Sequence, residues 1–200
     1  MADDPAVPVM VFNSYLSFGD DEPAVRAAVA ANVARTAARG VKVNIGGDPG
    51  LEREYGERLA AFVEVLGPDV AVLAECHAGT VAQDPATAAR VLAAAGPVDR
   101  VQAIVHTHQG DDELRACFDA YGERITHVHV NHLDDDHEAP RLADVADHLG
   151  AKVELLDRLG FKGSWTIEFV HGLGPADDRP DVLVERAADD LVVLRKVLDR

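Results

Sequence analysis

The chain has 200 residues, enough for one domain with a substantial core, and its 48% hydrophobic and 27% charged residues are typical of a soluble globular protein. Its formal net charge of -16 disfavours nucleic acid as a partner, because the phosphates would be repelled. With 2 cysteines, an acidic start (MADDPAVPV) and no apolar run of about 20 residues, we expect a cytoplasmic protein without disulfides, secretory signal or membrane span.

Six short runs rich in β-branched residues alternate with alanine-rich stretches. Each run is bounded by Gly, Pro or Asp, which is typical of buried strands in a parallel sheet. The predicted strands are VPVMVF (7–12), VKVNIG (41–46), DVAVLAECH (69–77), RVQAIVHTH (100–108), ITHVHV (125–130) and SWTIEFV (164–170).

Capping residues predict the helices between these strands. An acidic residue and a proline begin a helix, and a glycine just past the last turn ends it, because each suits the backbone at that end. The predicted helices run from Pro23 to Gly40, over 51–66, from Pro85 to Gly96, over 111–121, over 141–159 and from Pro180 to Arg200. This alternation predicts a single α/β domain over 1–200, built as an open doubly wound sheet or as a closed barrel.

Metal-capable side chains stand at the carboxyl ends of four consecutive strands, where both folds bind their ligands. Residues two apart in a strand point to the same face. Four such faces converge only if the sheet curls, which favours the barrel. The side chains are Glu75 and His77 on the third strand, His106 and His108 on the fourth, His127 and His129 on the fifth, and Glu168 on the sixth.

Two carboxylates and several imidazoles at one rim predict a site for a divalent transition metal. Mixed oxygen and nitrogen ligands suit Mn, Co, Zn, Fe or Ni better than Ca or Mg. Cys76 should point to the helix layer, so a structural zinc with thiolate ligands is not expected. A lone strand histidine is more often a hydrogen-bonded core residue, but four adjacent strands repeating the pattern favour a metal. Lys42 and Asn44, with Asn13, are weaker candidates for the same interior face.

Three segments in order resemble the sugar phosphate isomerase/epimerase family of xylose isomerase-like TIM barrels. They are AECHAGTVAQDPATA (74–88), ITHVHV (125–130) and LLDRLGFKGSWTIEFV (155–170), and the resemblance covers residues from about 40 to 172. It implies an incomplete TIM-barrel-like (β/α) fold of about six units, in which the first two units of the family are absent. We therefore expect a homo-oligomer, or a partner subunit that completes the barrel; an N-terminal segment that reorganises across the gap and a truncated, open barrel are the alternatives.

The resemblance also implies a set of metal ligands. The family holds one metal with Glu, Asp, His and Glu from four successive strands. The matching positions are Glu75, His129 and Glu168 for the first, third and fourth ligands. At the second, the family has an Asp followed three residues later by His, whereas this chain reads HTHQ from residue 106. His106 is therefore the expected second ligand, with His108 as the second choice.

The family function that follows is a metal-dependent isomerase or epimerase of a small sugar or sugar-like hydroxy-carbonyl compound, acting through an enediolate. Glu75 and Glu168 would transfer the proton, and His77, His108 and His127 would contact substrate oxygens. A lyase or dehydratase on the same scaffold and a non-catalytic degenerate barrel subunit are alternatives. A phosphodiesterase is disfavoured by the acidic charge.

Overall fold

The computed structural model describes residues 9–76, 78–134, 138–173 and 179–199. Its six strands form one sheet in chain order, and the pairs β1–β2, β2–β3, β3–β4 and β5–β6 are parallel. The strands are β1 (Val11–Asn13), β2 (Gly40–Asn44), β3 (Ala71–Glu75), β4 (Val101–His106), β5 (Ile125–Val130) and β6 (Ser164–Ile167). The predicted parallel α/β organisation is confirmed.

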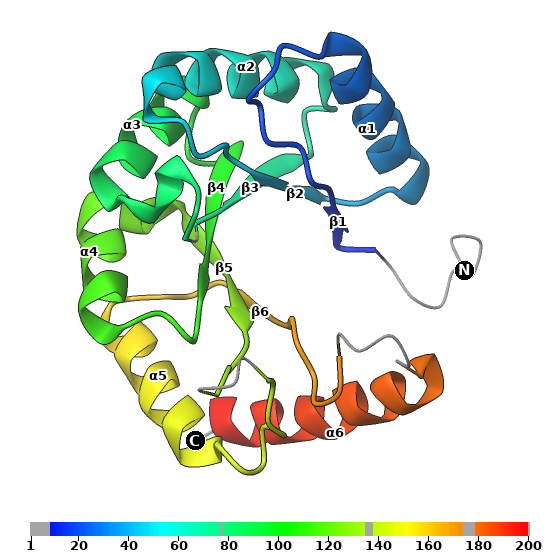
Figure 1. Cartoon of the computed structure of the whole chain (residues 1–200), viewed down its shortest axis with the longest axis vertical. Helices are drawn as coiled ribbons and strands as arrows, with labels where there is room; N and C mark the ends of the chain where they lie inside the picture. Colours follow the sequence, from blue (N-terminus) through cyan, green and yellow to red (C-terminus); the bar gives the residue numbers. More distant parts are fainter. Residues whose placement is uncertain (1–8, 77, 135–137, 174–178, 200) are drawn as a thin grey trace. The chain divides into compact units, whose positions relative to one another are not determined.

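Helices connect the strands (Figure 1). The α-helices are α1 (Pro23–Thr36), α2 (Glu52–Val65), α3 (Pro85–Ala95), α4 (Asp111–Tyr121), α5 (Ala146–Arg158) and α6 (Pro180–Leu198). Three short 3-10 helices, η1 (Pro49–Leu51), η2 (Val81–Gln83) and η3 (Gly122–Arg124), precede α2, α3 and β5. Within the described ranges, no helix combines the length and the hydropathy that crossing a membrane requires.

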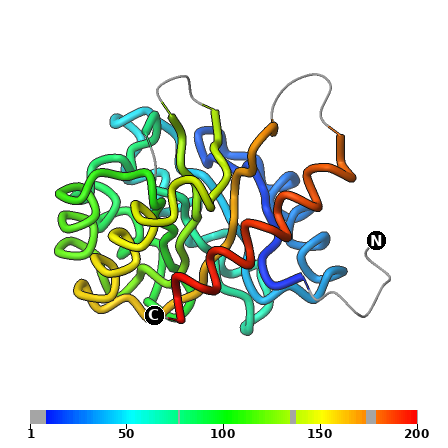
Figure 2. Tube along the Cα trace, turned by 90° about the horizontal axis from the view of Figure 1, so that it is seen from below, coloured from blue at the N-terminus to red at the C-terminus, as the bar shows by residue number. Residues whose placement is uncertain are grey.

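The chain forms two compact units, Met1–Ile104 with Cys117–Ile125, and Val105–Ala116 with Thr126–Arg200. Strand β4 passes from the first unit to the second after Ile104. In the first unit, buried residues lie on both faces of β2, and α2 packs closely against α3. In the second unit, α5 and α6 lie side by side (Figure 2).

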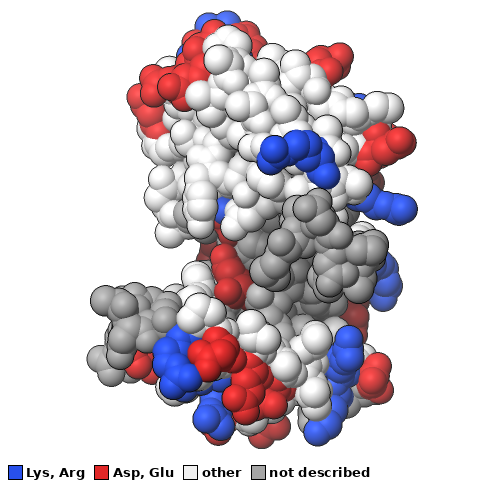
Figure 3. Space-filling view, turned by 90° about the vertical axis from the view of Figure 1, so that its right-hand side faces the viewer, with Lys and Arg blue, Asp and Glu red and all other residues white. Residues whose placement is uncertain are grey.

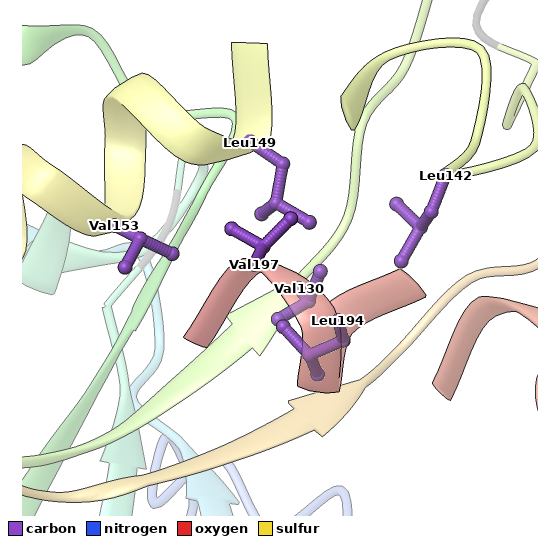
Figure 4. Packing of buried hydrophobic residues seen from close by; sticks show 6 residues of the cluster. All are labelled: Val130, Leu142, Leu149, Val153, Leu194 and Val197. Atoms are coloured by element: carbon purple, nitrogen blue, oxygen red, sulfur yellow. The ribbon is translucent and has the colours of Figure 1, made fainter. Parts of the chain in front are cut away.

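The core of the second unit explains the direction of the histidines in β5. Val130 packs with Leu142, with Leu149 and Val153 of α5, and with Leu194 and Val197 of α6, and each is at most 7% exposed (Figure 4). Because side chains alternate along a strand, burying Val128 and Val130 among the helices turns His127 and His129 to the opposite face. The predicted division of this strand into two faces is confirmed.

Two helix boundaries differ from the prediction by more than two residues. Helix α1 ends at Thr36 rather than at Gly40, because Ala37 adopts the left-handed conformation (φ 52°) that caps it. Gly40 instead begins β2, where an added Cβ would lie 2.7 Å from Cδ1 of Leu73. Helix α5 begins at Ala146 rather than near residue 141.

A long-range hydrogen bond holds the segment before α5. The backbone N–H of Leu142 donates to Oδ1 of Asp190 in α6 at 3.0 Å, and the following residues form turns. Turn hydrogen bonds from the N–H of Asp144 to the carbonyl of Arg141 at 3.0 Å and from the N–H of Val145 to the carbonyl of Leu142 at 3.3 Å occupy this segment, and the α-helix begins after them.

Candidate metal centre

Three of the predicted ligands lie together in the second unit. His106 is the last residue of β4, His129 belongs to β5, and Glu168 directly follows β6. Nδ1 of His129 lies 3.3 Å from Oε1 of Glu168, and Nε2 of His106 lies 3.7 Å from its Oε2. One ligand atom from each residue lies within 4.8 Å of those of the others.

The backbone of the sheet sets this arrangement. The N–H of Thr107 donates to the carbonyl of His129 at 3.0 Å, and the N–H of Glu168 donates to the carbonyl of Val130 at 3.0 Å. The side chain of His106 is 3% exposed, that of His129 is 11% exposed and that of Glu168 is 23% exposed. The cluster is therefore buried on its histidine side and more accessible at the carboxylate.

Asn131 organises the cluster, and sequence reasoning assigned it no role. Its Nδ2 donates to Oε2 of Glu168 at 2.5 Å, and its Oδ1 lies 2.7 Å from Nδ1 of His108. Its own backbone is held by Thr107, whose hydroxyl donates to the carbonyl of Asn131 at 2.6 Å and accepts from its N–H at 2.9 Å. Asn131 lies two residues beyond His129, so continuing the alternation of β5 past its end would have pointed to this residue.

His127 shares the histidine face of β5. Its Nδ1 lies 2.7 Å from the hydroxyl of Ser164, and its ring is 5.4 Å from that of His129 between centroids. Burial, followed by the neighbouring His129, lowers the pKa of His127 to about 4. The imidazole is therefore neutral near pH 7, the form in which it can both donate and accept a hydrogen bond.

In the first unit, Glu75 ends β3 and is 4% exposed. Its Oε2 lies 2.6 Å from Nζ of Lys42 and accepts a hydrogen bond from Nδ2 of Asn44 at 2.9 Å. Nζ of Lys42 also donates to Oδ1 of Asn44 at 2.9 Å. The two weaker candidates from β2 thus lie on the same face as Glu75, as predicted.

The strand register relates Glu75 to His106, the first predicted histidine ligand along the chain. Glu75 pairs with Ile104 in the parallel β3–β4 ladder. His106 is two residues further along β4, so the alternation of a strand places it on the same face as Ile104. Cys76 takes the opposite direction, and its buried thiol interacts with Tyr121 and Cys117 of α4, which agrees with the predicted orientation. His77 lies outside the described residues.

The second-unit donors fit a divalent transition metal. Two imidazoles and one carboxylate, held by backbone and side-chain hydrogen bonds, are a donor set found in catalytic zinc sites and non-haem iron sites. Asn131 fixes the orientation of the Glu168 carboxylate, as second-layer hydrogen bonds do in metalloproteins. His106, His129 and Glu168 can therefore hold such an ion.

Solved structures of other proteins have a fold similar to that of this chain. No family model matches the sequence, and no curated protein matches it. The structure of an IolI protein with a bound zinc atom is similar, with a TM-score of 0.65 and 12% identity, covering 94% of this chain and 74% of that one. A xylose isomerase-like TIM barrel/4-hydroxyphenylpyruvate dioxygenase fusion protein gives a TM-score of 0.67 and 15% identity over 94% of this chain and 33% of that one. The predicted resemblance is thus confirmed in fold: the six strands of this chain and the helices between them are arranged as in these TIM-barrel structures.

Proposed function

We propose that this chain is a divalent-metal-dependent isomerase or epimerase of a small sugar or sugar-like hydroxy-carbonyl compound. The observation that carries the proposal is the convergence of His106, His129 and Glu168 at the carboxyl ends of β4, β5 and β6. That edge is where barrels of this kind build their active sites. The similar fold of a zinc-containing IolI protein supports it.

We propose Glu75 as the fourth ligand, with Mn, Co, Zn, Fe or Ni as the metal. The basis for Glu75 is the motif resemblance together with its register beside β4. When bound, the cation would supply a Lewis acid that weakens the C–H bond next to a carbonyl and stabilises negative charge on oxygen. The carboxylate and imidazole groups of the chain would donate and accept the protons.

The two carboxylates suit the two halves of a proton transfer. Glu168 is the more exposed, and Asn131 holds its Oε2, so its Oε1 keeps a defined direction. Glu75 is buried beside the ammonium of Lys42, which would donate to a substrate oxygen as well as to the carboxylate. One carboxylate removes the proton and the other returns it. His127, neutral and hydrogen-bonded to Ser164, can donate to a substrate hydroxyl.

The experiment measures exchange of substrate C–H with deuterated water, by NMR, over a panel of ketoses that includes D-fructose and D-ribulose. Glu168→Gln should slow the exchange at least about 100-fold, because general acid–base groups contribute factors of this size. Glu154→Gln is the matched control, since its side chain is 76% exposed on α5. Unchanged exchange in Glu168→Gln would remove this glutamate from the chemistry.

Product mass separates the isomerase from a lyase, which loses water or another group after the same first step. Elemental analysis of the purified chain and of His129→Ala tests the metal. A chain that binds metal but exchanges no substrate proton would favour the non-catalytic alternative.

The predicted homo-oligomer or completing partner subunit stays a prediction, and light scattering of the purified chain would test it. In Figure 3, basic side chains on the face shown are dispersed among acidic ones, an arrangement that does not favour a phosphodiester substrate.

A further inference from the structure

A cavity of the first unit has a charged side chain, Arg26, in its wall. It has a volume of about 250 Å³ and lies between the loop that follows β1 and the first half of α1. Its lining includes Tyr15 and Ser17 from the loop, Asp20 and Glu22 just before the helix, and Val25 and Arg26 from α1. The loop follows the carboxyl end of a strand, the end at which this fold binds its ligands.

The side chain of Arg26 indicates that the cavity binds a ligand. The residue is 8% exposed, and its Nη2 donates to Oδ1 of Asp21 at 2.7 Å. Its Nη1 is buried and has no hydrogen-bond partner among the described residues. Leaving a charged donor buried and unsatisfied is costly, and such groups in native proteins call for an acceptor from elsewhere.

The loop around this guanidinium is firmly held. Phe18 adopts a left-handed backbone conformation (φ 60°), which is unfavourable for a residue with a bulky side chain. Its ring is buried against Phe62 at 5.9 Å between centroids. Nη1 of Arg58 donates to the carbonyls of Phe18 at 2.8 Å and Gly19 at 2.6 Å. Strained backbone that its surroundings maintain in this way is typical of ligand sites.

The charged side chains around the cavity indicate the chemical class of its ligand. Arg26 is accompanied by the carboxylates of Asp20, Asp21 and Glu22, so an anion would meet more negative than positive charge. A hydroxyl group suits both kinds of partner, because its oxygen can accept from the guanidinium of Arg26 while its hydrogen donates to a carboxylate. The ring of Tyr15 and the side chain of Val25 offer apolar surface to the C–H groups of such a ligand. We infer that the cavity binds an uncharged polyol of monosaccharide size.

Tyr15 links this cavity to the proposed catalytic carboxylate. Nζ of Lys42 lies 4.9 Å from the centroid of the Tyr15 ring and 2.6 Å from Oε2 of Glu75. Tyr15, in the wall of the cavity, and Glu75 thus lie near the same ammonium, so a sugar with its carbonyl end at Glu75 would have its hydroxylated tail near Tyr15. The cavity is therefore the subsite for the tail of the substrate, an assignment that rests on the proposed function.

The test measures binding of D-ribose to the full chain after treatment with EDTA, by saturation-transfer NMR. Saturable binding is expected, and Arg26→Gln should weaken it about tenfold or more, because a hydrogen bond from a charged donor is lost. Arg35→Gln, on the exposed side of the same helix, is the matched control and should bind normally. Val25→Trp fills the mouth of the cavity without touching the charge, and should also abolish binding.

Inorganic phosphate serves as the competing probe. Displacement of D-ribose by phosphate, or normal D-ribose binding in both Arg26→Gln and Val25→Trp, would overturn the inference. Glu168→Gln separates it from the proposed function, since this variant should lose proton exchange and keep D-ribose binding. A chain that exchanges ketose protons and binds no polyol here refutes the subsite alone. A chain that binds D-ribose through Arg26 and exchanges no proton refutes the catalytic proposal and supports the cavity.

Discussion

Replacing Lys42 by Met tests the buried ion pair beside the proposed fourth ligand. Nζ of Lys42 and Oε2 of Glu75 are 2.6 Å apart, and each side chain is 6% exposed. Methionine keeps most of the stem of the lysine and removes only its charge and its hydrogen bonds. Taking one partner from a buried ion pair costs about 3–5 kcal/mol, because the remaining charge stays out of water.

The loss should fall near the lower end of that range. Nδ2 of Asn44 still donates to the carboxylate of Glu75 at 2.9 Å, so the anion keeps one strong hydrogen bond. We expect the free energy of unfolding to fall by about 3 kcal/mol, which lowers the Tm of a chain of this length by roughly 6–12 °C. Urea titration at pH 7 in the presence of EDTA, followed by circular dichroism, measures the change.

Lys162→Met is the matched control, since Lys162 is exposed, and it should change the free energy of unfolding by less than about 0.5 kcal/mol. The double variant Lys42→Met/Glu75→Gln should recover part of the loss, because the unpaired charge is then gone. If Glu75 binds metal, Zn²⁺ at 100 times the Kd of Lys42→Met, which stabilises that variant by about 2.7 kcal/mol, should stabilise the double variant less at the same concentration, because loss of a ligand raises the Kd. A loss in Lys42→Met no larger than in the control would show that water solvates the carboxylate and would refute the reasoning.

Three further predictions concern other parts of the chain. Asn131→Ala should weaken metal binding about 10-fold to 100-fold in a titration with Zn²⁺ while the circular dichroism spectrum is unchanged, because the carboxylate of Glu168 loses its hydrogen bond; unaltered affinity would contradict this role. Leu194→Ala, at a side chain 2% exposed in the second-unit core, should lower the free energy of unfolding by about 2–5 kcal/mol in urea, and a loss below 1 kcal/mol would contradict that packing. Burial raises the pKa of the Cys76 thiol to about 12, so a thiol reagent at pH 8 should label it only after unfolding; rapid labelling of the folded chain would exclude that burial.

The strand pattern and the candidate ligands could be predicted from local sequence. The predicted and observed bounds of β5 agree, and alternation along ITHVHV already separated the valines from the histidines. β-branched residues at every second position determine both the strand and its faces, so no distant contact is needed to orient His127 and His129. The same alternation brought Lys42 and Asn44 to the interior face of β2.

Contacts between distant segments were decided only in the tertiary structure. Asn44 and Glu75 are 31 residues apart and meet because the parallel β2–β3 register pairs them. Asn131 and Glu168 are 37 residues apart and meet across the ends of β5 and β6. The alternation of side chains along a strand predicts which face of the sheet a side chain occupies. It does not predict which residue of the neighbouring strand lies opposite, because the register depends on how the intervening helices pack. The backbone of Phe18 and the burial of Arg26 have the same origin, since loop conformation follows from long-range contacts rather than from local propensity.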